Sequence, residues 1–64
     1  VYEGSRGNLT WLLQAALLFN GFDPGPIDGI NGPKTQKALK AFQKAKGLVV
    51  DGVAGKETWS ALLR

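Results

Sequence analysis

One stretch of this sequence occurs twice and decides the fold. The residues Asp28-Gly29-Ile30-Asn31-Gly32-Pro33-Lys34-Thr35-Gln36-Lys37-Ala38-Leu39 return 23 positions later as Asp51-Gly52-Val53-Ala54-Gly55-Lys56-Glu57-Thr58-Trp59-Ser60-Ala61-Leu62. Six of the twelve paired positions are identical. A repeat of this kind indicates that one structural unit is built twice.

Each copy predicts a turn followed by a helix. Asp-Gly favours a turn, because Asp bonds nearby backbone amides and Gly accepts a positive φ without steric cost. The second Gly of each copy, Gly32 or Gly55, is a tolerated N-cap, and Pro33 suits the first helical position. We therefore expect helices to begin near Pro33 and Lys56. In each of them the repeated Thr, Ala and Leu share one face, which we expect to be buried.

An earlier helix is predicted from Asn8, as N-cap, to about Asn20, with Gly21 ending it. Ser5 is the competing cap. Residues 1–7 read as an N-terminal arm and residues 8–64 as the domain.

The first helix carries two apolar faces. At about 100° per residue, one arc of about 160° holds the expected core face, which comprises Leu9, Leu12, Leu13, Ala16, Leu17 and Phe19. Trp11, Ala15 and Leu18 form a second stripe on the opposite side. The core does not require this stripe, so we expect it to have another partner.

The rest of the chain completes the predicted fold. Residues 22–27 form a Pro-rich loop that Phe22 and Ile27 should anchor to the core. The second helix should run from Pro33 to Lys46. Its lysines at 37, 40 and 44 face solvent, and residues 48–50 form a lid or a short extended piece. The third helix runs from Lys56 to the chain end. We predict an all-α fold, a small three-helix bundle with two repeated Asp-Gly turn/helix units.

Composition limits the function. The 64 residues include neither Cys nor His, so disulfides, zinc–thiolate sites and the common nucleophilic triads are excluded. A two-carboxylate glycosidase site is formally possible, but the two repeated Asp residues are better explained as turn formers. No apolar run approaches a membrane span. The absence of Met, even at position 1, suggests a piece of a longer chain. We expect no cofactor, no metal and no catalysis.

Spaced residues along nearly the whole chain, from about Gly7 to Leu62, match a known family. They are Leu13-Gln14, Leu17, Gly21-Phe22, Pro24 to Gly29, Gly32, Thr35, Ala38, Phe42-Gln43, Gly47-Leu48, Asp51-Gly52, Gly55, Thr58-Trp59 and Leu62. The sequence resembles the peptidoglycan-binding domain 1 family, three-helix modules appended to bacterial and phage cell-wall hydrolases. Thr10 and Asn20 depart from it, since the family usually has aliphatic residues there; this favours a core face rotated toward Leu9, Leu12, Ala16 and Phe19.

The resemblance implies a non-catalytic module that binds peptidoglycan and targets an attached amidase, peptidase, lysozyme-like enzyme or endolysin outside the cell or in its wall. Two alternatives stay open. The net charge of +3 would suit a helix-turn-helix nucleic-acid binder, although base-reading Asn or Arg side chains are lacking on the lysine helix. The domain could also be a docking module that packs on its own enzyme. We expect no nucleic acid, no membrane partner and a monomeric isolated domain.

Candidate ligand contacts each have a structural alternative. They are Trp11, Gln14, Leu18, Gln43 and Trp59. The glutamines could instead bond loop backbone, Trp59 could belong to the core, and Trp11 with Leu18 could pack on the Val1-Tyr2 arm or on a neighbouring domain. We interpret six residues as structural turns: Asp28, Gly29, Gly32, Asp51, Gly52 and Gly55.

Overall fold

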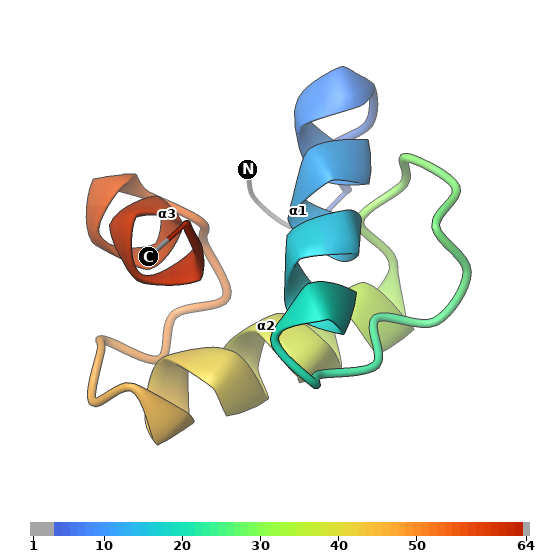
Figure 1. Ribbon diagram of the computed structural model, residues 1–64. Coiled ribbons are helices and arrows are strands. Elements are labelled where there is room, and N and C mark those ends of the chain that lie inside the picture. The colour runs from blue at the N-terminus through green and yellow to red at the C-terminus, as the bar shows by residue number, and fades with distance from the viewer. Residues whose placement is uncertain (1–3, 64) are drawn as a thin grey trace.

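A computed structural model describes residues 4–63. Its helices are α1 (Asn8–Phe19), α2 (Pro33–Ala45) and α3 (Lys56–Leu62). α2 crosses beneath one end of α1, α3 lies on the other side of the molecule, and the loop between α1 and α2 bulges outward (Figure 1). The predicted all-α, three-helix fold is confirmed, as are the helix starts at Pro33 and Lys56. Within residues 4–63 no helix is long and apolar enough to cross a membrane.

The first two helices end in the same way. Gly21 and Gly47 adopt positive φ values of 87° and 70°. The next amide then reaches back: Phe22 N donates to Leu17 O at 2.9 Å, and Leu48 N donates to Gln43 O at 2.8 Å. This is the Schellman arrangement, in which a left-handed glycine satisfies the last carbonyls of a helix. At both places this arrangement reverses the direction of the chain, so that Phe22 and Leu48 pack against the core.

The N-cap of α1 differs from the prediction. Asn8 is the first helical residue and Gly7 is the cap, with no side-chain hydrogen bond. Gly7 N donates to Gly29 O at 2.9 Å, so the first Asp-Gly turn fixes this backbone position. Its φ of 113° favours glycine, which explains why neither Ser5 nor Asn8 caps the helix.

The described part of the N-terminal arm pairs with the segment after the first turn. Gly4 N donates to Asn31 O at 3.0 Å, and Asn31 N donates to Ser5 O at 2.8 Å. An isolated antiparallel bridge joins Arg6 to Ile30. The suggested packing of Trp11 and Leu18 on Val1-Tyr2 lies outside the described residues.

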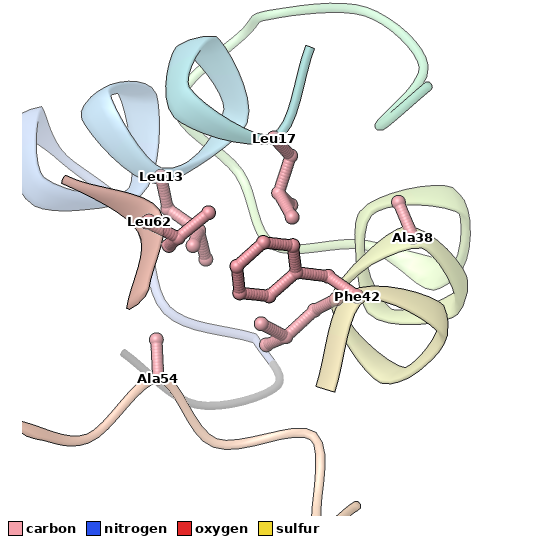
Figure 2. Close-up of a cluster of buried hydrophobic side chains, with 7 residues drawn as sticks. Leu13, Leu17, Ala38, Phe42, Ala54 and Leu62 are labelled. Atoms are coloured by element: carbon pink, nitrogen blue, oxygen red, sulfur yellow. The ribbon is translucent and has the colours of Figure 1, made fainter. Parts of the chain in front are cut away.

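A small apolar cluster fills the space between the helices. Phe42 of α2 lies in its middle, with Leu13 and Leu17 of α1 and Leu62 of α3 around it (Figure 2). Phe22 meets the Phe42 ring edge-on, at 5.5 Å between ring centroids. One aromatic side chain therefore contributes to the packing of elements from all parts of the chain.

The predicted core face of α1 is wrong in part. Leu13 and Leu17 are buried as expected, but Leu9, Leu12 and Phe19 are 66%, 42% and 90% exposed. The helix instead buries Thr10, Leu13, Gln14 and Leu17. The prediction failed because it assigned only apolar residues to the buried face. Thr10 and Gln14 are polar, yet both are buried.

Of the other expectations for side-chain exposure, some are confirmed and some are wrong. The lysines at 37, 40 and 44 face solvent as predicted. Phe22 packs on the core, whereas Ile27 is half-buried outside the core cluster. Leu48 covers the core but Val49 is 71% exposed, so only the first residue of the 48–50 segment acts as a lid.

We predict that Phe42→Ala lowers the free energy of unfolding by about 3 to 5 kcal/mol, because a cavity replaces the centre of the core. A 64-residue domain has a total stability of roughly 3 to 10 kcal/mol, so this variant should lose a large part of it. Phe19→Ala is the matched control, since its ring is 90% exposed. Urea denaturation followed by circular dichroism measures both; equal stability of the two variants would contradict the described core.

Candidate functional site

The first Asp-Gly turn is held by a buried glutamine. Gln14 Nε2 donates to Asp28 Oδ1 at 3.1 Å, to Ile30 O at 2.9 Å and to Thr35 Oγ1 at 2.9 Å, its two hydrogens being shared among three acceptors. Gln14 Oε1 accepts from Gly29 N at 2.9 Å. One side chain on α1 therefore fixes both the turn and the start of α2. We call this arrangement the glutamine clasp.

The second repeat contains the same clasp. Gln43 Nε2 donates to Asp51 Oδ1 at 3.1 Å, to Val53 O at 3.0 Å and to Thr58 Oγ1 at 3.2 Å. Gln43 Oε1 accepts from Gly52 N at 3.1 Å. This clasp joins α2 to α3, so the relative position of these helices depends on it.

The aspartates of the turns bond forward along the chain as well. Asp28 Oδ1 accepts from Ile30 N, and Asp51 Oδ1 from Val53 N, both at 2.9 Å. The pKa of Asp28 is lowered chiefly by the Gln14 amide and then by the Ile30 N–H. The pKa of Asp51 is lowered chiefly by the Val53 N–H, partly opposed by desolvation, with a smaller effect from Gln43. These hydrogen bonds therefore favour the ionised form of both carboxylates.

The predicted ligand-contact residues differ in how exposed they are in the structure. Gln14 and Gln43 are buried, and the nitrogen and oxygen of each amide are engaged in a clasp. Trp59 is half-buried against the core. Trp11 and Leu18 are about half exposed on α1. The glutamines therefore position the turns and helices, while Trp11 and Leu18 remain accessible.

A hollow of about 570 Å³ lies where the ends of α1 and α2 meet α3. It is lined by Asn20, Lys46, Leu48, Lys56, Glu57, Ser60 and Ala61. Its wall thus combines two ammonium groups with a carboxylate, a hydroxyl and an amide. Leu48 and Ala61 add an apolar part. Among the described residues, no group of three His, Cys, Asp or Glu could hold a metal ion.

Several contacts give the walls of this hollow their shape. Asn20 Nδ2 donates to Ala16 O at 2.7 Å and to Leu62 O at 3.3 Å, which links α1 to α3. Lys46 Nζ lies 5.8 Å from the centre of the Phe42 ring, within range of a cation–π attraction. The Gln43–Thr58 bond fixes the start of α3, where Lys56 and Glu57 stand.

Sequence reasoning missed the residues of this hollow. Asn20 and Lys46 directly precede the glycines that end α1 and α2, so they occupy equivalent C-cap positions. This equivalence was visible in the sequence as a polar residue before Gly21 and Gly47. Asn20 and Lys46 line the same hollow as Ser60 because of the way α3 packs, and no local sequence pattern indicates this packing.

The two clasps, the three helices and the polar hollow define a small helical repeat module. Residues 6–62 match the family described as "Putative peptidoglycan binding domain", and the chain belongs to this family. The expected family membership is thereby confirmed.

Solved structures and relatives agree with this assignment. The SleB N-terminal domain is 41% identical with a TM-score of 0.94, over 98% of this chain and 86% of that chain. The endolysin of Burkholderia phage AP3 is 44% identical with a TM-score of 0.92, over 97% of this chain but 24% of that one. A spore cortex-lytic enzyme of Bacillus cereus is 41% identical over 64 residues. This chain spans 25% of that enzyme's length.

We predict that Gln14→Glu lowers the free energy of unfolding by about 3 kcal/mol or more at neutral pH. The new carboxylate would be buried, could not donate to Asp28 Oδ1, and would repel that carboxylate. The same change at Gln43 should have a similar effect, because its contacts are the same. Chemical denaturation measures both variants. A loss below about 0.5 kcal/mol, as at an ordinary surface site, would refute the structural role of the clasp.

We also predict acid sensitivity from the turn aspartates. Because their folded pKa values are lowered, their contribution is fully present above the unfolded pKa of about 3.9. It is lost as the pH falls through the folded pKa values. Asn can still accept through Oδ1, so the double variant Asp28→Asn, Asp51→Asn should fold and show a weaker loss of stability between pH 5 and 2. Urea titrations across about pH 2 to 7 test this; parallel curves would contradict it.

Proposed function

We propose that this chain is a non-catalytic module that binds peptidoglycan and holds an attached cell-wall hydrolase on its substrate. The family match across residues 6–62 carries the proposal. The Bacillus cereus relative is a lytic enzyme and the phage relative an endolysin, and this module is about a quarter of each. The proposed place of action is therefore the cell wall, outside the cytoplasm.

We assign ligand contact to the hollow at the ends of α1 and α2. The stem peptides of peptidoglycan present carboxylates and amides. Lys46 and Lys56 offer charge-assisted hydrogen bonds to carboxylates, and Asn20 and Ser60 offer polar groups to amides. Leu48 provides an apolar surface for the methyl groups of the peptide. In this proposal Gln14 and Gln43 support the site through their clasps rather than touching the ligand.

In this proposal the module binds peptidoglycan through few contacts, and its attachment to a catalytic domain strengthens the binding. A hollow of this size contacts one small segment of a polymer, so binding by a single module is modest. Attachment to a catalytic domain that binds the same polymer raises the effective concentration of each partner for its site. The module thus lengthens the residence of the enzyme on the wall.

A pull-down on purified insoluble peptidoglycan, stripped of teichoic acids, tests the proposal. We expect Lys46→Gln to weaken retention about tenfold, because it removes a charged donor from the hollow. Lys44→Gln is the matched control: it removes the same charge from α2, but its side chain does not line the hollow. Retention should survive moderate salt, and DNA-cellulose should retain little of the domain.

Other outcomes separate the alternatives. An equal loss in both lysine variants would indicate general charge attraction rather than the hollow. Strong, salt-sensitive retention on DNA-cellulose would favour a nucleic-acid binder. No retention of the unmodified domain on either matrix would favour a docking module that packs on its own enzyme.

A further inference from the structure

A second polar hollow lies where the C-terminal end of α1 meets the N-terminal part of α2. Its volume is about 430 Å³, and its lining includes Phe22, Asp23, Gly25, Lys34, Lys37 and Ala38. We call it the Lys37 hollow, and we call the hollow described above, which Lys46 and Lys56 line, the Lys46 hollow. The two are neighbours at the end of α1, since Asn20 lines the Lys46 hollow and Gly21 lines the Lys37 hollow.

Equivalent parts of the two repeats build the two hollows. Phe22 and Leu48 each follow the glycine that ends a helix, and Ala38 and Ala61 occupy the same position of the repeat. Phe22 and Ala38 line the Lys37 hollow, whereas Leu48 and Ala61 line the Lys46 hollow. Each hollow therefore lies between the end of one helix and the beginning of the next. A structural unit that occurs twice has formed the same hollow twice.

Both hollows also contain the same set of charged groups. The Lys46 hollow has two ammonium groups and the carboxylate of Glu57. The Lys37 hollow has the ammonium groups of Lys34 and Lys37 and the carboxylate of Asp23. These charges do not come from aligned positions, because Lys34 corresponds to Glu57 in the repeat. Sequence identity between the repeats therefore does not explain why the two hollows share their charges.

The loop after α1 positions the charged groups of the Lys37 hollow. Asp23 Oδ1 accepts from Gly25 N at 2.9 Å, so the carboxylate is held in place while Oδ2 faces no donor among residues 4–63. A Cβ at Gly25 would lie only 2.9 Å from Cδ of Lys34, so the loop backbone packs closely on the stem of this lysine. Neither Lys34 nor Lys37 forms an ion pair with a residue of the described range. The hollow therefore offers two charged donors and one charged acceptor to a ligand.

We propose that the Lys37 hollow is a second binding site for a stem peptide of peptidoglycan. Lys34 and Lys37 donate charge-assisted hydrogen bonds to a carboxylate of the peptide, and Asp23 accepts from a peptide N–H. Phe22 provides an apolar surface beside them. This inference rests on the proposed function and adds a second site to it.

Two sites change how the module binds a polymer. Lys37 and Lys46 are separated by about 14 Å along the axis of α2, at about 1.5 Å per residue, so the two hollows hold separate segments of the ligand. Peptidoglycan carries many stem peptides, so one module can bind it at two points. Binding at the second point is then intramolecular, which raises the overall affinity above that of either site.

An NMR titration of the isolated, ¹⁵N-labelled domain tests the second site, because the backbone amides of each hollow report on it separately. The SleB N-terminal domain, of which the matching region is 86%, shows that a relative forms this fold without an attached catalytic domain. The probe is a soluble disaccharide that carries one stem peptide. We expect it to shift the amide signals of Asp23 and Ala38 in the Lys37 hollow as well as those of Leu48 and Ala61 in the Lys46 hollow.

A pair of double variants links these signals to binding of the polymer. Lys34→Gln with Lys37→Gln should abolish only the shifts in the Lys37 hollow, and should lower retention on insoluble peptidoglycan at least about tenfold. Lys40→Gln with Lys44→Gln is the matched control, since it removes the same charge from α2 at residues that line neither hollow. The control should keep both sets of shifts and most of the retention.

The outcomes distinguish this inference from the proposed function. Shifts confined to the Lys46 hollow would overturn the second site and leave the proposed function standing. Shifts in neither hollow would overturn both. An equal loss of retention in the two double variants would also overturn the second site, because general charge attraction would then explain the effect of Lys34 and Lys37.

Discussion

Two buried glutamine side chains determine how the parts of this small domain fit together. Each lies on one helix, bonds the Asp-Gly turn that follows, and reaches the threonine in the first turn of the next helix. Burying an amide is unfavourable unless its hydrogen bonds are made inside. Here both ends of each amide are satisfied, so the arrangement that makes these bonds is favoured over others. The few apolar side chains around Phe42 then pack in the space that the clasps define.

The clasps also explain how the two repeats can differ and still build the same unit. Gln14 and Asp28 are 14 residues apart, whereas Gln43 and Asp51 are only 8 apart. The amide bonds only the turn and the next helix, so the length of the intervening loop is free. In the first repeat Thr35 Oγ1 also donates to Pro24 O at 3.0 Å, which ties the longer loop to the same point. The second repeat needs no such bond because its connection is short.

Surface chemistry is divided among the helices that the clasps position. α1 turns its apolar outer face to solvent, α2 presents its lysines, and the polar hollow lies where α3 meets the ends of both. The C-cap positions of α1 and α2 supply Asn20 and Lys46 to that hollow. The arrangement that builds the two turns thus also brings two equivalent polar positions close to α3.

Much of the fold follows from the sequence alone. The repeat places two turns and two helix starts, and Gly21 and Gly47 mark the ends of α1 and α2, because these features depend on backbone conformations that Asp, Gly and Pro favour locally. The order of the helices follows from the same residues, and the family follows from spaced residues along nearly the whole chain. Only the tertiary structure decided which face of α1 is buried. Gln14 turns inward because its partners lie on a turn 14 to 16 residues away, and Phe19 faces outward as a result. The hollow needed the structure for the same reason: its residues come from α3, from the C-cap positions of α1 and α2 and from Leu48. Their positions relative to one another depend on hydrogen bonds between residues far apart in the sequence.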